Sequence, residues 1–139
     1  MIIHAYTDGA SRGNPGESGI GIVLKDEHGS TIGSHFGYIG QTTNNIAEYM
    51  ALLTCLQIVQ SIPCQHLFVY SDSELMVRQM NGQYKVKDAG IRKHFLHIQK
   101  ILTASQFQFV IKHVPREQNL DADKLANRGI DTKKKMILK

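Results

Sequence analysis

Four acidic residues of this sequence stand where their carboxylates could form one metal site. Asp8 and Asp72 each end an apolar run of the kind that forms strands, while Glu48 opens a helical pattern. Asp123 lies near the start of the last segment with helical spacing. Acidic side chains at the carboxyl ends of neighbouring strands point into the crevice where open α/β sheets bind ligands. Because gathered carboxylates repel one another unless a cation neutralises them, we predict a Mg²⁺ or Mn²⁺ site.

The composition is that of one globular domain with a basic surface. The chain has 139 residues, a net charge of +4 and an isoelectric point near 9.1. This length suffices for one core, so we expect a single domain over 1–139. A basic protein with an acidic centre fits a polyanionic substrate, since the basic rim would bind phosphates and the acidic centre would bind metal. The mild positive charge on its own would equally serve solubility.

No segment of the sequence predicts export or membrane insertion. The N-terminus lacks a basic stretch followed by an apolar segment, and no apolar run approaches the ~20 residues of a membrane span. Cys55 and Cys64 form no metal-binding pattern, and we expect them to be free thiols. We therefore expect a cytoplasmic protein that acts as a monomer and has no membrane partner.

Apolar periodicity and turn residues predict the elements that would position the carboxylates. The predicted strands cover 2–7, 19–25, 31–40, 67–71 and 107–113. The predicted helices cover 44–61, 73–81, a segment that starts near 88 and carries apolar residues through 102, and 119–128. Short turns join the first three strands, which makes them antiparallel neighbours. The order β-β-β-α-β-α-α-β-α predicts an α/β fold, a five-stranded mixed sheet with helices on both faces.

Two glycine-containing stretches are predicted to lie outside these elements. The segment 9–16 is expected to form a glycine-rich loop after the first strand. Gly129 is expected to end the last helix, and the basic tail 131–139, which contains Lys-Lys-Lys at 133–135, is expected to fray.

Four short motifs in a fixed order carry the most specific information. The first, Asp-Gly-Ala-Ser-Arg-Gly-Asn-Pro-Gly at 8–16, joins a strand-end carboxylate to a turn that exposes backbone N–H groups. The others are Thr-Asn-Asn-Ile-Ala-Glu at 43–48, Tyr-Ser-Asp-Ser at 70–73, and the stretch from His-Val-Pro-Arg at 113–116 to Ala-Asp-Lys-Leu-Ala at 122–126. In this order the chain resembles type 1 ribonuclease H over nearly its whole length.

The resemblance implies a ribonuclease H-like fold and an activity. Members hydrolyse the RNA strand of an RNA–DNA hybrid with two metal ions, leaving 5′-phosphate and 3′-hydroxyl ends. The family's four metal-binding carboxylates match Asp8, Glu48, Asp72 and Asp123. Asp8 would bridge two Mg²⁺ ions, and Mn²⁺ is expected to substitute. Asp121 competes with Asp123, but the two face nearly opposite sides of a helix, and the Ala-Asp-Lys-Leu-Ala context favours Asp123.

The resemblance also assigns residues that would handle protons and substrate. His113 matches a mobile-loop histidine that assists proton transfer or product release, and Arg116 is its rival on the same loop. Asn14 and Thr43 match positions that hold a phosphate of the DNA strand. The surface where 2′-hydroxyls would be sensed matches the backbone of Gly9, Ala10 and Ser11, together with Asn44 and Asn45.

One departure from the family pattern leaves substrate affinity open. Many members carry a basic helix-loop insertion rich in Lys and Trp, whereas here 83–87 leads directly to the next helix and the chain has no Trp. The sequence therefore resembles the compact bacterial and archaeal form without this protrusion. Two alternative functions are a nuclease of the same fold acting on DNA or double-stranded RNA, and a non-catalytic nucleic-acid-binding module. The first and second motifs argue for hybrid binding, and the full set of carboxylates argues for catalysis.

Overall fold

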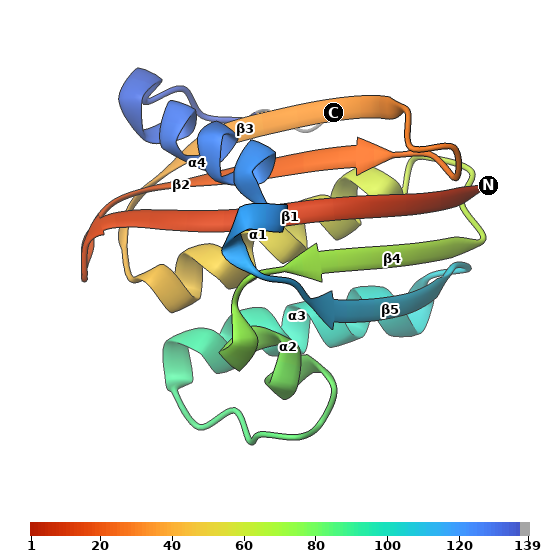
Figure 1. Ribbon diagram of the computed structural model, residues 1–139. Coiled ribbons are helices and arrows are strands. Elements are labelled where there is room, and N and C mark those ends of the chain that lie inside the picture. Colours follow the sequence, from red (N-terminus) through yellow and green to blue (C-terminus); the bar gives the residue numbers. More distant parts are fainter. Residues whose placement is uncertain (137–139) are drawn as a thin grey trace.

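In the computed structural model, which describes residues 1–136, a five-stranded mixed sheet separates two helical layers (Figure 1). The strands are β1 (Ile2–Gly13), β2 (Gly16–Lys25), β3 (Thr31–Thr42), β4 (His66–Ser71) and β5 (Gln108–His113). Across the sheet they follow the order β3-β2-β1-β4-β5. The β1, β2 and β3 strands are antiparallel neighbours, and β4 runs parallel to both β1 and β5. The predicted fold class is confirmed.

The helices lie on both faces of the sheet. They are α1 (Asn44–Val59), α2 (Glu74–Met80), α3 (Ala89–Ala104) and α4 (Leu120–Thr132), with a short 3-10 turn at Arg116–Gln118. Figure 1 shows α4 on the near face and α1 and α3 behind the sheet. Side chains cap three helices at their first turns, which explains why they begin where they do. Thr43 accepts from Ile46 N, Ser73 from Met76 N and Asp88 from Ile91 N.

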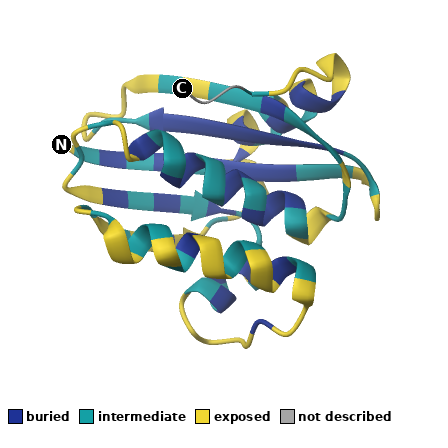
Figure 2. Cartoon of the chain, turned by 180° about the vertical axis from the view of Figure 1, so that it is seen from behind, coloured by how far each residue is buried: buried dark blue, intermediate teal, exposed yellow. Residues whose placement is uncertain are grey.

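The core lies between the sheet and the layer of α1 and α3. Ile3 and Ala5 of β1 point into it without exposure, as do Leu52 and Leu56 of α1. Figure 2 shows the buried residues of α1 and the central strands as one continuous block, with the exposed residues of α3 turned outward. Cys55 is buried in this core, and both cysteines are free thiols, as predicted. In residues 1–136, no helix is both long and apolar enough to cross a membrane.

The segment predicted as a glycine-rich loop is instead a β-hairpin, and the prediction is wrong. β1 continues as far as Gly13, and β2 begins at Gly16, so that only Asn14 and Pro15 form the turn. The two strands stay paired to the end, with Ser11 opposite Ser18. Because the ladder satisfies the backbone groups, this stretch is ordered strand, and the residues expected to touch substrate sit on a rigid element.

The last helix also departs from the sequence-based prediction. α4 does not end at 128 but continues to Thr132. A Cβ atom on Gly129 would lie 2.4 Å from the carbonyl oxygen of Gly37, so this glycine allows α4 to touch β3 instead of ending the helix. Beyond α4, Tyr38 N donates to Lys134 O at 2.7 Å. The prediction of a frayed tail is therefore wrong for 131–136, and 137–139 lie outside the described residues.

We expect Gly21→Ala to lower the free energy of unfolding by about 1–3 kcal/mol. A Cβ atom at this position of β2 would lie 2.2 Å from the backbone oxygen of Ala122, so α4 would have to move away from the sheet. Gly33→Ala is the matched control, because its Cβ atom would first meet side chains, those of His35 at 3.2 Å and Leu24 at 3.6 Å, with no backbone atom as close. Urea unfolding of both variants measures the difference, and equal stabilities would contradict the close packing of α4 on β2.

Candidate active site

Three carboxylates converge at one point of the sheet. Oxygen atoms of Asp8, Glu48 and Asp72 all lie within 4.8 Å of one another. Asp123 belongs to the same group, since its carboxylate helps to raise the pKa of Asp8. All four line one open cleft of about 600 Å³. The structure therefore brings together the four acidic residues singled out in the sequence.

Diverging parallel strands place Asp8 and Asp72 side by side. The pairing of β1 with β4 ends at Tyr6 opposite Tyr70, so each aspartate stands two residues beyond the last pair. This is the position at which open α/β sheets form a crevice. The chain turns immediately after Asp72, because Ser73 N donates to Ser71 Oγ at 3.0 Å before α2 begins.

A close approach of α1 to β1 brings Glu48 to the same point. Gly9 N donates to Glu48 Oε1 at 2.8 Å in a buried hydrogen bond. A Cβ atom on Gly9 would lie 2.2 Å from the backbone carbon of Ala47, so only glycine permits this contact. The residue that follows Asp8 thus determines how near α1 can bring its carboxylate.

Asn119 links α4, which carries Asp123, to β1 by a hydrogen bond. Its side chain is 1% exposed, and its Nδ2 donates to Thr7 O at 2.9 Å. Asp123 N in turn donates to Asn119 O at 3.1 Å, one helical turn further on. Asn119 was predicted only to start this helix. An asparagine at a helix start ordinarily caps its own helix, so no pattern in the sequence indicates this cross-link.

The electrostatics of the cleft favour a bound cation. Burial raises the pKa of the Asp8 carboxyl, and the nearby Glu48 and Asp72 raise it further. Burial likewise raises the pKa of Glu48, against the opposing effect of the hydrogen bond from Gly9. Raised values mean that full ionisation of the set is costly without a counter-charge. The donor atoms are all carboxylate oxygens, which fits a hard divalent ion such as Mg²⁺ or Mn²⁺.

Comparison with known proteins places this chain in a family. A family model described as reverse transcriptase-like matches residues 6–129. The chain is 32% identical to a ribonuclease H of Methylococcus capsulatus, over 93% of this chain and 89% of that protein. The chain belongs to the type 1 ribonuclease H family. It is also 37% identical to ribonuclease HI of Halobacterium salinarum over 93% of its own length, but it spans only 64% of that protein.

Solved structures of ribonucleases H1 share the fold closely. LC11-RNase H1 in complex with an RNA/DNA hybrid has a TM-score of 0.90 and 45% identity, over 94% of this chain and 97% of that one. RNase H1 from Halobacterium salinarum also has a TM-score of 0.90, with 37% identity over 95% of this chain and 99% of that one. A bifunctional protein of Mycobacterium tuberculosis is 40% identical over 94% of this chain, which spans 36% of its length.

The substrate-binding residues expected of a ribonuclease H divide into two groups. Five of them line the cleft with the carboxylates: Gly9, Ala10, Ser11, Asn44 and Asn45. Asn14 and Thr43 lie outside this lining, although Asn44 N donates to Asn14 Oδ1 at 3.2 Å. Ser11 N donates to Asn44 Oδ1 at 3.0 Å, so polar contacts join β1 to the start of α1. The cleft also includes residues that were not predicted, namely Ser73, Glu74, Leu75 and Asn127.

The two candidates for the loop assistant occupy different positions. His113 is the last residue of β5 and is exposed, and it does not line the cleft. Arg116 lies three residues further on, in the 3-10 turn, and does line it. The geometry favours Arg116, while the assignment to His113 stays a prediction.

We expect Asp8→Asn to stabilise the metal-free protein at neutral pH. The pKa of Asp8 is raised in the folded state above its ordinary value of 3.8, so the folded state binds more protons than the unfolded state. This contribution to stability is complete below that value and is lost as the pH rises toward the folded-state pKa of about 10, so the free energy of unfolding should fall between about pH 4 and about pH 10. The variant should flatten this slope and gain at least about 1 kcal/mol at neutral pH.

Thermal unfolding in the presence of a chelator measures this effect. Asp26→Asn is a suitable control, because this aspartate lies in the turn between β2 and β3 and does not line the cleft. A wild-type stability that does not depend on pH over this range would contradict the crowding of the carboxylates.

Proposed function

We propose that this chain hydrolyses the RNA strand of RNA–DNA hybrids and leaves 5′-phosphate and 3′-hydroxyl ends. The observation that carries the proposal is the convergence of the Asp8, Glu48 and Asp72 oxygens within 4.8 Å, in a cleft that also contains Asp123. Family membership supports it, as does the similarity to an RNase H1 whose structure contains an RNA/DNA hybrid. Because the chain spans only part of some relatives, the activity is proposed for this domain alone.

The four carboxylates are proposed to hold two Mg²⁺ ions, for which Mn²⁺ can substitute. When bound, such ions supply an activated water for attack and positive charge at the leaving 3′ oxygen. Asp8, which is 4% exposed and whose pKa the other three carboxylates all raise, would contribute to the binding of both ions. Gly9 N orients Glu48 by holding one of its oxygens, which leaves the other free to bind. Asp72 and Asp123 are less buried and complete the site from β4 and α4.

The cleft is proposed to accept the minor groove of the hybrid. β1 presents the backbone of Gly9, Ala10 and Ser11 at the cleft, and α1 presents Asn44 and Asn45. These backbone and amide groups can form hydrogen bonds with the 2′-hydroxyls that distinguish RNA from DNA. The net charge of +4 favours a polyanionic partner.

Asn14 and Thr43 are proposed to hold a phosphate of the DNA strand. Neither residue lines the cleft, but Asn14 accepts a hydrogen bond from Asn44 N and Thr43 directly precedes Asn44, so both adjoin the surface proposed to contact the RNA strand. Between α2 and α3, residues 81–88 contain no inserted helix, so the basic protrusion of many relatives is missing. We therefore expect hybrid binding to depend on the cleft and on these two residues.

Further proposals concern the domain organisation, the oligomeric state and the cellular location. We propose a single domain over 1–139 that acts as a monomer, because one chain supplies every residue of the cleft. A cytoplasmic location is proposed as well, since the free thiols of Cys55 and Cys64 suit a reducing compartment.

Asp72→Asn should abolish cleavage and leave the fold intact. The substitution removes one charged ligand from the site without changing the volume of a half-buried side chain, so metal binding fails while packing survives. Cleavage of labelled RNA–DNA hybrid, double-stranded RNA and duplex DNA, with and without Mg²⁺, is the measurement, with circular dichroism as the check on folding. Near-normal turnover of the variant at saturating Mg²⁺ would refute the site assignment. Wild-type cleavage of duplex DNA but not of the hybrid would refute the proposed substrate.

Paired substitutions on the loop before α4 identify the assisting residue. We expect Arg116→Ala to reduce turnover by about 10- to 100-fold, because its guanidinium lines the cleft and can contact a substrate phosphate. His113→Ala should change turnover by less than about threefold if the exposed end of β5 stays away from the reacting atoms. Single-turnover rates over a range of pH measure both. The reverse result would assign the role to His113.

A further inference from the structure

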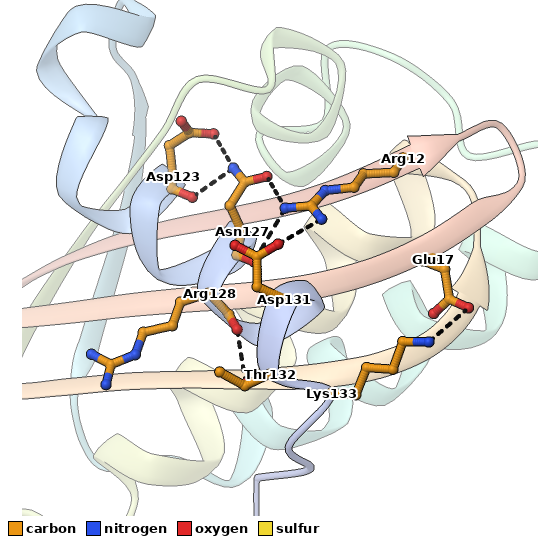
Figure 3. A network of polar contacts seen from close by, with 8 residues as sticks. All are labelled: Arg12, Glu17, Asp123, Asn127, Arg128, Asp131, Thr132 and Lys133. Atoms are coloured by element: carbon orange, nitrogen blue, oxygen red, sulfur yellow. Dashed lines mark hydrogen bonds and ion pairs between the residues drawn. The ribbon is translucent and has the colours of Figure 1, made fainter.

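The carboxylate of Asp123 is oriented by a contact within its own helix. Asn127 lies one turn further along α4, and its Nδ2 donates to Asp123 O at 3.0 Å and to Asp123 Oδ1 at 3.4 Å (Figure 3). Asn127 itself lines the cleft. A donor on one carboxylate oxygen holds that oxygen in place and leaves the other free to turn toward Asp8.

A second contact determines which end of the Asn127 amide faces Asp123. Arg12 Nη2 donates to Asn127 Oδ1 at 3.3 Å and to Asn127 O at 3.4 Å. A guanidinium offers only donors, so the amide must turn its oxygen toward Arg12 and its NH₂ group toward Asp123. Rotating the amide by half a turn would place two donors together at one end and two acceptors together at the other. The arginine therefore selects the orientation that supports the carboxylate.

The position of Arg12 is itself maintained by an ion pair. Its Nη1 lies 2.7 Å from Asp131 Oδ1, one turn beyond Asn127 on α4. Figure 3 shows the Arg12 side chain extending from β1 to α4, where it contacts Asn127 and Asp131. Both members of the ion pair are about half exposed, so the pair contributes little stability. Its effect is geometric, since it fixes the guanidinium opposite the amide.

We propose that Arg12 and Asn127 act as a positioning pair that sets the orientation of the Asp123 carboxylate for metal binding. This inference rests on the function proposed above. Arg12 belongs to the same strand as Asp8, so one strand supplies the central carboxylate and also orients the carboxylate that α4 brings to it. Partners of this kind around metal ligands typically change metal affinity or activity by about 10- to 100-fold.

Asn127→Asp tests the pair with almost no change in shape. The substitution replaces the donor to Asp123 with an acceptor, so we expect the Mg²⁺ concentration for half-maximal cleavage to rise about 10-fold. The KM for hybrid is measured alongside the metal dependence, because Asn127 lines the cleft in which the hybrid is proposed to bind. The rise in thermal unfolding temperature on adding Mn²⁺ without substrate should shrink as well. An active wild type together with an unchanged metal dependence of the variant would overturn the inference.

Arginine variants separate positioning from general charge. Arg12→Ala should move the metal dependence in the same direction, and Arg12→Lys should restore part of it. Arg128→Ala is the matched control, since this arginine of α4 lies over the Phe36 ring at 4.8 Å and points away from Asp123 (Figure 3). Equal effects of Arg12→Ala and Arg128→Ala would overturn the inference in favour of a charge effect.

The two proposals can fail separately. Because Arg12 is exposed, its substitution tests the pair even if Asn127→Asp does not fold. A wild type that cleaves no hybrid would refute the proposed function, whereas Mn²⁺-dependent stabilisation of the same variants would still decide the positioning role.

Discussion

Repulsion between carboxylates is the constraint around which this molecule is built. Asp8 and Glu48 are 4% and 9% exposed, and burial and mutual proximity raise the pKa of both. Such an arrangement opposes folding unless a rigid scaffold imposes it and a cation relieves it. The scaffold is the apolar core between the sheet and α1, which fixes the strand and the helix that carry these two residues. The cation is the divalent metal for which the oxygen-only donor set is suited.

The scaffold works by contacting β1 closely from both faces. On one face, Gly9 lets α1 approach until Glu48 accepts from the strand backbone. On the other, Gly21 lies opposite Asp8 in the sheet and lets α4 approach until Asn119 reaches the carbonyl of Thr7. A side chain on either glycine would hold its helix away from the strand. The distances among the carboxylates therefore depend on backbone contacts rather than on the acidic residues themselves.

The sequence predicted what local pattern determines and missed what depends on contacts between distant segments. Element order and sheet type followed from apolar periodicity and short turns, and the four carboxylates followed from motifs on the predicted elements. The hairpin at Gly13 and Gly16 was predicted as a loop, because glycine content signals flexibility when the partner strand is not visible. Gly129 was read as a helix end for the same reason, although it serves packing. Asn119 lies 112 positions from the residue it binds, and no local pattern reveals such a bond.

Because burial and mutual proximity raise the pKa of Asp8 and Glu48, a divalent metal that binds near neutral pH must displace protons from these two carboxyls. Isothermal titration calorimetry with Mg²⁺, performed near neutral pH in two buffers of different ionisation enthalpy, counts the protons released on binding. We expect proton release at neutral pH, and less release as the pH rises and the carboxyls ionise by themselves. Metal binding without proton release at any pH, or no binding at millimolar Mg²⁺, would contradict it.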